Sequence, residues 1–457
     1  MNWFPKLPFG KGPRYLQITS ALENDIATGK VSPGERLPTH RVMAEHLGLS
    51  VGTVSKAYAA AERRGLISGE VGRGTFVQRP TPDLFVTENT SSRGPINLAL
   101  NAPPDTAEDQ ALAKVMIDVM NSDRLRSLMS YLPHQGRSDH RSIFADWISR
   151  TGMSISAEML HITHGAQHAI SIAMRLLVRG GAPVLAENLP YSGIMSLAFI
   201  DGYSLRGVVM DRHGLVPERL DEAFRETGAK VLYCTPTLQS ATGALMPLDR
   251  RKEVAEIVRR HEAWIVEDDA YGFLCDDPVP TLSSLLPLQS FYIVSFAKCL
   301  SPGLRIGAMV TPPEFRDKTI NAIRSTGWMA NPIMAEAVAK LIAGGLLDEQ
   351  IQKKRFAARI RNDLAKKILG SLVVKMSETP AFHTWMELPA GRTHSGLISQ
   401  AAQCGVTVSS PTLLHPFDEM RNGIRLCLGG PESISDLEQA LKTLLAILQD
   451  AETMSFV

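Results

Sequence analysis

A lysine in an unusual setting lies in the C-terminal two thirds of the chain. Lys298 follows an apolar run, with Ser295 three residues before it and Arg305 seven residues after it. A lysine at such a position is usually a solvated surface group. Apolar neighbours and a nearby cation, however, lower the pKa of a lysine and make its amine a nucleophile that forms Schiff bases. The hydroxyl and the guanidinium suit a phosphate dianion.

Two acidic residues mark the end of a second apolar run. Asp268 and Asp269 follow Ile-Val-Glu, and Tyr271 comes three residues after Asp268. A carboxylate that pairs with a pyridinium nitrogen keeps the ring protonated, so that the ring acts as an electron sink. We assign this role to Asp268. The alternatives are a simple strand cap or a Mg²⁺ site.

A third segment has the pattern of an anion-binding helix start. Thr163-His-Gly-Ala-Gln167 opens a predicted helix, whose exposed N–H groups and dipole favour an anion. Such starts are also common without any ligand, so this pattern carries weight only in combination with the other two.

These groups need a sheet and helices to position them. The predicted strands are 184–187, 231–234, 264–267 and 291–295, and the predicted helices are 112–120, 166–177, 250–262 and 335–343. Their alternation predicts an α/β domain with a largely parallel sheet. The tail, 356–448, mixes both patterns and predicts a small C-terminal α+β subdomain.

Together, these segments resemble the class I (fold type I) aminotransferases from Ile96 to the C-terminus. Further matching motifs are Tyr131-Leu-Pro, Leu189-Pro-Tyr-Ser-Gly and Asn422-Gly-Ile-Arg-Leu. The resemblance implies the fold of a PLP-dependent transferase, with pyridoxal 5′-phosphate (PLP) carried as a Schiff base on Lys298. It implies that Asp268 binds the nitrogen of the PLP ring and that Tyr271 binds the O3′ atom of PLP.

The resemblance also assigns the remaining contacts. It implies that Tyr191 stacks on the ring and that Arg425 binds an effector carboxylate. The phosphate would be bound by the backbone of Ala166 and Gln167 and by Ser295 and Arg305. Tyr131 would contact the phosphate in the partner subunit. The last contact implies a homodimer, because the site is otherwise incomplete.

One position departs from the family pattern. Where the family has Asn-Pro-Thr-Gly, this chain has Ser240-Ala-Thr-Gly. The family's asparagine hydrogen-bonds the cofactor's O3′ and tunes the Schiff-base pKa. Ser240 therefore puts efficient transamination in doubt, whereas PLP binding rests mainly on Lys298, Asp268 and the phosphate contacts.

The first 78 residues have the pattern of a winged helix-turn-helix. Predicted helices cover 15–29, 39–47 and 51–64, with Ser50 as the N-cap of the third, and strands 66–68 and 75–77 flank a Gly-rich turn. In this geometry the N-terminal end of the third helix enters the major groove. The predicted DNA contacts are Arg41, Ser50, Thr53, Lys56 and Arg73 at the wing tip.

This head resembles the GntR family of bacterial regulators. The matching segments are Gly34-Glu-Arg-Leu-Pro-Thr-His-Arg41, Leu49-Ser-Val-Gly-Thr-Val54 and Gly72-Arg-Gly-Thr-Phe-Val77. Val51 stands where the family usually has arginine, so a common base or phosphate contact is missing. The alternative is a winged helix that serves only protein contacts.

Charge and composition agree with this division. Residues 1–80 hold 11 Lys and Arg against 6 Asp and Glu, and the remainder holds 37 against 41, so the head is basic and the body acidic. No apolar run approaches the ~20 residues that span a bilayer. The five cysteines show no metal-ligand spacing. We expect a cytoplasmic protein without metal or membrane partners, divided into a DNA-binding domain (1–78), a polar linker (79–95) and a PLP domain (96–457, its small subdomain from about 340).

Head and body in this order resemble the MocR/GabR-type subfamily of GntR regulators. We favour a transcriptional regulator that binds an operator in double-stranded DNA and senses an amine, an amino acid or PLP itself. A working aminotransferase of the 2-aminoadipate or aromatic type with a fused head is the alternative: Lys298, Asp268 and Arg425 support it, and Ser240 opposes it. Whether the chain is an enzyme is therefore left open. A DNA-binding protein whose large domain only dimerises conflicts with the nearly complete set of PLP residues.

Overall fold

The chain forms two compact units, Met1–Phe85 and Val86–Val457. The computed structural model describes residues 3–5, 13–27, 30–31, 35–63, 66–70, 74–77, 94–150, 152–411, 413–414 and 422–454. Most of the predicted linker (79–95) lies outside these ranges, so its boundaries stay a prediction.

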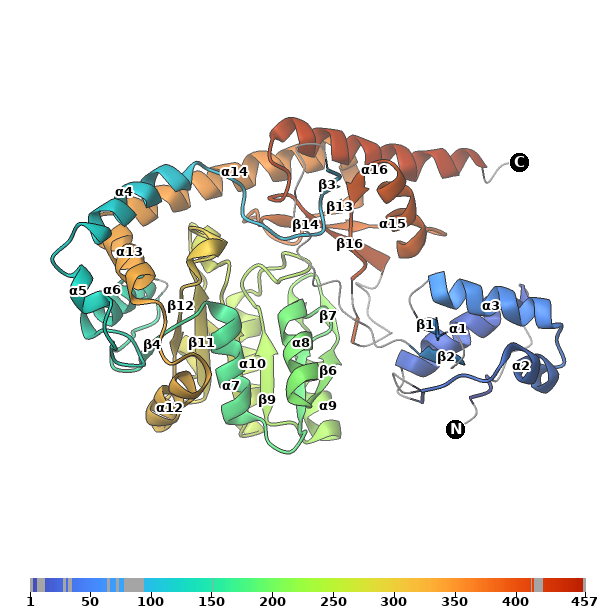
Figure 1. Ribbon diagram of the computed structural model, residues 1–457, viewed down its shortest axis with the longest axis horizontal. Coiled ribbons are helices and arrows are strands. Elements are labelled where there is room, and N and C mark those ends of the chain that lie inside the picture. The colour runs from blue at the N-terminus through green and yellow to red at the C-terminus, as the bar shows by residue number, and fades with distance from the viewer. Residues whose placement is uncertain are drawn as a thin grey trace. The chain divides into compact units, whose positions relative to one another are not determined.

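The first unit is a winged helix-turn-helix built as expected from capped helices. It contains α1 (Arg14–Ala27), α2 (His40–Leu47), α3 (Val51–Arg63), β1 (Ile67–Glu70) and β2 (Gly74–Val77) (Figure 1). Thr39 caps α2 by accepting from the Val42 N–H at 3.4 Å, and Gly48 ends it in the left-handed region at φ 63°. Ser50 Oγ accepts from the Thr53 N–H at 3.2 Å and caps α3, as the sequence predicts.

A third backbone segment pairs with the wing. Arg36 forms a β-bridge with Phe76, the Leu37 N–H donates to Thr75 O, and the Val77 N–H donates to Glu35 O, each amide bond at 2.9 Å. The sequence analysis predicted no strand pairing for 35–37. Three residues are too few to reveal strand periodicity, and the pairing is decided by the neighbouring hairpin.

The second unit is centred on a seven-stranded sheet. Its strand order is β4 (Leu160–Thr163), β12 (Gly307–Val310), β11 (Ser290–Ser295), β10 (Trp264–Asp268), β9 (Val231–Cys234), β5 (Pro183–Glu187) and β6 (Ser204–Val208). Only β12 runs antiparallel to its neighbours, so the prediction of a largely parallel sheet is confirmed. The sequence analysis missed β4, β6 and β12.

Helices cover both faces of this sheet, as Figure 1 shows. Side chains at alternate strand positions, such as Val266 and Ile293, pack with α7 (Ala166–Leu177) and α8 (Ser192–Asp201), and the intervening positions pack on the opposite face. The other elements of this lobe are α4 (Glu108–Met120), α5 (Leu125–Leu128), α6 (Ser138–Ser149), β7 (Met210–Asp211), β8 (Gly214–Leu215), α9 (Pro217–Thr227), α10 (Leu248–Arg260), η1 (Gly272–Leu274), α11 (Leu282–Leu285), η2 (Pro302–Leu304), η3 (Pro313–Phe315), α12 (Arg316–Gly327) and α13 (Pro332–Ala343).

A long helix, α14 (Leu346–Leu369), leads into the small α+β lobe (Figure 1). This lobe contains η4 (Gly370–Leu372), β13 (Val373–Val374), β14 (His383–Glu387), α15 (His394–Gln403), β15 (Val406–Thr407), β16 (Gly423–Cys427) and α16 (Ile434–Met454). The short β3 (Ile96–Asn97) pairs in parallel with β15, and Leu98 is fully buried in the core of this lobe. The first described residues of the unit thus pack into the lobe that is formed mainly by its C-terminal residues.

Candidate functional site

Lys298 lies three residues beyond the end of β11, at the edge where the parallel strands finish. Its Nζ donates a hydrogen bond to the backbone carbonyl of Asn101 and lies 5.9 Å from the centre of the Tyr271 ring. Burial lowers the pKa of Lys298 to about 8, helped by the nearby Arg425 guanidinium and opposed by Asp268 and Cys427. The amine can therefore lose its proton near neutral pH and act as a nucleophile.

Asp268 is the last residue of β10 and is 5% exposed. Its Oδ2 accepts a hydrogen bond from the Tyr233 hydroxyl at 3.0 Å, whereas Oδ1 has no hydrogen-bond partner within the described ranges. Burial raises the pKa of Asp268 to about 7, with Tyr233 and Lys298 opposing the rise. A buried carboxylate oxygen without a partner is costly, and the protonated nitrogen of a PLP ring would satisfy it. The residues present therefore fit this cofactor.

Asn101 joins several site residues that are far apart in sequence. Its Nδ2 donates to the Tyr271 hydroxyl at 2.7 Å and to His383 Nδ1 at 3.1 Å. His383 Nε2 in turn donates to Gln239 O at 2.9 Å, and burial lowers the pKa of His383 to about 3, so the ring is neutral. The sequence analysis missed Asn101 and His383. The available signal was a polar residue between Leu-Ala-Leu and Ala-Pro-Pro.

Ser240 and Arg425 meet beside this network. Arg425, on β16, donates to Ser240 O at 3.0 Å and to Ala99 O at 3.2 Å. Ser240 is 5% exposed, and its Oγ lacks a hydrogen-bond partner among the residues that the structure describes. Because both contacts of Arg425 are neutral carbonyls, its charge remains available to an anion.

The buried carboxyl group of Glu187 helps to fix the loop that carries Ser240. Gln239 Nε2 donates to Glu187 Oε2 at 3.1 Å and to Leu189 O at 2.7 Å, while its Oε1 accepts from the Ala241 and Thr242 N–H groups. Burial raises the pKa of Glu187 to about 7. Sequence reasoning assigned no role to either residue.

The predicted phosphate ligands lie at one corner of the sheet. Gly165 precedes Ala166 and Gln167 at the start of α7 with φ 80°, and Arg305 donates to His164 O at 3.2 Å. A Cβ on Gly165 would lie 3.0 Å from Arg305 Nη2. A Cβ on Gly307, which pairs with Ser295, would lie 2.8 Å from the Gly165 carbonyl carbon. The Arg305 guanidinium therefore lies beside the start of α7, an end of a helix that favours anions.

Tyr191 borders this group, and Tyr131 does not. Tyr191 precedes α8, and a Cβ on Gly193 would lie 2.2 Å from both the Tyr191 ring and Gln167 Oε1. Tyr131 is 84% exposed and contacts Trp328 at 5.7 Å between ring centres. Its reach into a partner subunit stays a prediction.

The predicted DNA contacts sit around the start of α3. Arg41, Ser50 and Lys56 are exposed, and Thr53 is half-buried and shares a hydrogen bond of 2.9 Å with Ser50. Val51 is 45% exposed at the first helical position. Arg73 lies outside the described residues.

The described ranges lack two kinds of feature. Neither a group of three His, Cys, Asp or Glu residues that could hold a metal ion nor a helix long and apolar enough to cross a membrane occurs in them.

Known proteins match both parts of the chain. The family described as aminotransferase class I and II matches residues 93–444, and the family described as bacterial regulatory proteins, gntR family, matches residues 14–77. Together these matches cover most of the two units.

Relatives match most or nearly all of the chain. The uncharacterized HTH-type transcriptional regulator YdeF of Bacillus subtilis is 27% identical over 98% of this chain and 97% of its own length. The probable rhizopine catabolism regulatory protein MocR of Rhizobium meliloti is 27% identical over 75% of this chain and 74% of its own length.

Solved structures match the larger unit. The alpha-aminoadipate aminotransferase LysN of Thermus thermophilus, solved with N-(5'-phosphopyridoxyl)-L-leucine, has a TM-score of 0.71 at 23% identity and covers 79% of this chain and 94% of its own. This likeness establishes the fold. Together with the family matches, it shows that the chain belongs to the aminotransferase class I and II family and carries a gntR-family domain at its N-terminus.

Proposed function

We propose that this protein is a PLP-dependent transcriptional regulator that binds an operator through its N-terminal unit and senses an amine, an amino acid or PLP through the larger unit. The observation that carries the proposal is the buried, pKa-lowered Lys298 facing Asp268 in a chain that also holds a gntR-family domain. YdeF, which matches this chain over 98% of its length, and MocR, which matches it over 75%, are named as regulators. Such a protein acts where the chromosome is, in the bacterial cytoplasm, and as a homodimer on two half-sites.

In this proposal Lys298 and Asp268 hold the reactive part of the cofactor. PLP bound there supplies an aldehyde that condenses with amines and a protonated ring that withdraws electrons. Lys298 holds and exchanges the proton at its own Nζ, since its pKa lies near neutrality. Asp268 Oδ1 would accept from the ring nitrogen and favour its protonated form, and Tyr271 would lie on the O3′ side.

The other predicted ligands position the cofactor. Ser295, Arg305 and the N–H groups of Ala166 and Gln167 would bind the phosphate, Tyr191 would stack on the ring, Ser240 would face O3′, and Tyr131 would complete the partner's site. These assignments rest on the family pattern together with the positions described above.

An effector carboxylate on Arg425 would compete with the carbonyl of Ala99. Ala99 and Asn101 belong to one segment, which follows β3 and also receives the Lys298 hydrogen bond. Occupation of the site would thus displace a segment that begins just after the predicted linker. An effector can shift the DNA-binding equilibrium only through such a differential contact.

A working aminotransferase is the second candidate, because Lys298, Asp268 and the carbonyl-held Arg425 are all retained. Ser240 weighs against it, since a serine hydroxyl is shorter than the asparagine amide that the family uses.

The experiment is a titration of the PLP-loaded protein with amino acids and amines, followed by visible absorption and by fluorescence anisotropy of operator DNA. We expect a ligand that shifts the visible band without forming the pyridoxamine cofactor and that changes DNA affinity at least fivefold. Borohydride should fix PLP to the native protein and not to Lys298→Ala. Conversion to the pyridoxamine form, restored by a keto acid and without effect on DNA, would establish the aminotransferase instead.

A further inference from the structure

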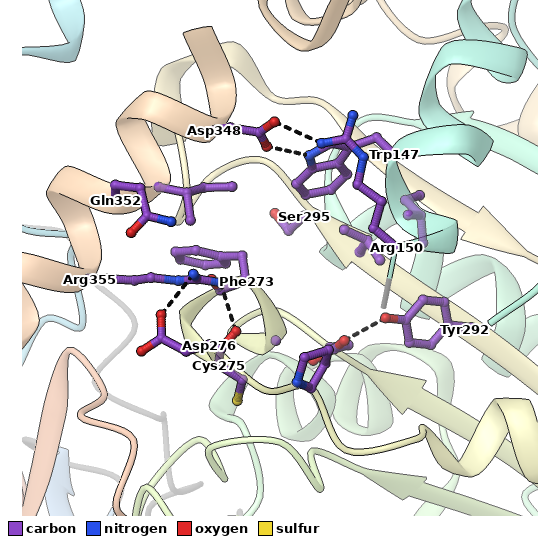
Figure 2. Close-up of a pocket in the computed structure, with 16 residues that line it drawn as sticks. Trp147, Arg150, Phe273, Cys275, Asp276, Tyr292, Ser295, Asp348, Gln352 and Arg355 are labelled. Carbon is purple, nitrogen blue, oxygen red and sulfur yellow. Dashed lines mark hydrogen bonds and ion pairs between the residues drawn. The ribbon is translucent and has the colours of Figure 1, made fainter. Parts of the chain in front are cut away.

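A cavity of about 230 Å³ lies between α6, η1, β11 and α14. Figure 2 shows that Trp147 and Arg150 border it on one side, Gln352 and Arg355 on another, and Tyr292 at its base. Lys298, Asp268 and Arg425 are not among the described residues that line it, whereas Ser295, one of the predicted phosphate ligands, is.

Apart from Ser295, which borders both, the cavity and the proposed PLP site are lined from opposite faces of the same strands. Asp268 interacts with Tyr233, which packs against α7 and α8, whereas Asp269 interacts with Tyr292, which packs with α6 and α13. Successive side chains of a strand point to opposite faces, so adjacent carboxylates serve two different sites.

One atom of the cavity wall needs a partner. Asp269 is 6% exposed, and its Oδ2 accepts a hydrogen bond from the Tyr292 hydroxyl. For the part of the chain that is described, Asp269 Oδ1 has no hydrogen-bond partner. A buried carboxylate oxygen in this position favours a bound cation or donor.

The cations around the cavity are already matched. Arg355 donates to Asp276 Oδ1 at 2.9 Å and to two carbonyls, and Arg150 donates to Asp348 Oδ2 at 2.7 Å (Figure 2). Arg251 lies 3.8 Å from Glu267. Burial raises the pKa of Asp269, and Tyr292, Arg251 and the Gly272 amide oppose the rise, so a cationic ligand would favour its ionised form. The group left to meet a cation is therefore the Asp269 carboxyl.

The remaining wall is aromatic and apolar. Trp147, Phe273 and Tyr292 contribute rings, and Val294 and Ile351 contribute aliphatic side chains. Aromatic faces attract organic cations, whereas a strongly hydrated metal ion would find only one free carboxylate oxygen here.

We propose that this cavity binds a small organic amine as its ammonium cation, with Asp269 Oδ1 as the acceptor and the three rings as the wall. The site is separate from Lys298 and does not rest on the proposed function. Because Asp269 adjoins Asp268, an amine bound here would act on the proposed cofactor site through β10 without entering it.

The test is calorimetric titration of the full-length protein with n-butylamine hydrochloride, before and after borohydride reduction. Reduction prevents any reaction of the amine with PLP at Lys298. We expect binding of one ammonium ion per chain that persists after reduction, and at least tenfold weaker binding of n-butanol and butyrate. Absence of amine binding, or equal binding of n-butanol, would overturn the proposal.

Matched variants locate the acceptor. Asp269→Asn should weaken butylammonium binding at least tenfold, while Asp348→Asn, at the half-exposed rim of the same cavity, should change it less than threefold. Equal losses in the two variants would contradict Asp269 as the acceptor. Should Asp269→Asn fail to fold, Ile351→Phe fills the cavity from α14 and should also abolish binding. Unchanged affinity in that variant refutes the site.

Discussion

Burial moves the pKa values of Lys298 and Asp268, the two groups at the centre of the candidate site, toward each other. The pKa of Lys298 falls to about 8 and that of Asp268 rises to about 7, because loss of water penalises both charged forms. The two groups can therefore exchange protons with a ligand near neutral pH. Glu187, beneath the loop of Ser240, is affected in the same way, and its titration can be measured through stability.

Glu187→Gln should change how stability depends on pH. Its pKa rises by burial from 4.5 to about 7, so between these values the folded state binds more protons than the unfolded state. Raising the pH through this window destabilises the native protein, fully so above pH 7, by up to about 3 kcal/mol. Glutamine has no such penalty, and its oxygen can keep the three hydrogen bonds that Glu187 Oε2 accepts from Thr235 and Gln239.

Urea unfolding at pH 5 and pH 8 checks this expectation. The free energy of unfolding of the native protein, relative to that of the variant, should be lower at pH 8 than at pH 5. Glu253→Gln, on the exposed side of α10, serves as the control and should show no such trend. A difference between native protein and Glu187→Gln that is constant with pH would contradict the assignment.

At the scale of elements, the sequence predicted those with a strong local signal. The cap Ser50 located the start of the third helix of the head, and the apolar runs of β9, β10 and β11 located the centre of the sheet. It could not reveal β3 or the pairing of 35–37, since two or three residues carry no periodicity. The position of Lys298 was predictable from its local sequence. Asn101 was not, because it contacts Lys298 from a distant segment and has no local signal of its own.

Helix α3 should supply a salt-dependent part of DNA affinity. Lys56 is exposed on the helix whose start is capped by Ser50, and a lysine that neutralises a phosphate releases counterions. Lys56→Ala should weaken operator binding and reduce the slope of log affinity against log salt by about 1. The matched control is Lys30→Ala, whose amine is 3.1 Å from Asp25. Equal slopes for native protein and Lys56→Ala would show that α3 does not face the phosphates.

At the scale of the whole molecule, the larger unit leaves an apolar surface around Tyr131. Met129 is 71% exposed, Tyr131 84% and Trp328 44%, and the Leu132 N–H contacts Met329 Sδ at 3.3 Å. Large apolar groups gathered on one surface favour association. The proposed contact of Tyr131 with a partner's phosphate requires a second copy at this surface.

Tyr131→Asp combined with Met129→Asp should therefore dissociate the proposed homodimer. Light scattering after gel filtration should give a mass near the 49.9 kDa of one chain, and the protein should retain less PLP. Phe199→Asp, at an equally apolar exposed position on α8, should stay dimeric. A double variant that keeps the native mass would place the interface elsewhere.

The pairing of β3 with β15 has a consequence for biosynthesis. Residues 96–97 leave the ribosome early, but their partner, 406–407, is among the last strands to be made. The small lobe cannot complete its sheet until nearly the whole chain has emerged, whereas the core cluster and the hairpin described for the winged helix-turn-helix lie within residues 3–77. Since domains generally fold as units during synthesis, the nucleic-acid-binding unit would be complete while its sensor is still a nascent chain. A truncated product would then carry a folded head without the lobe that regulates it.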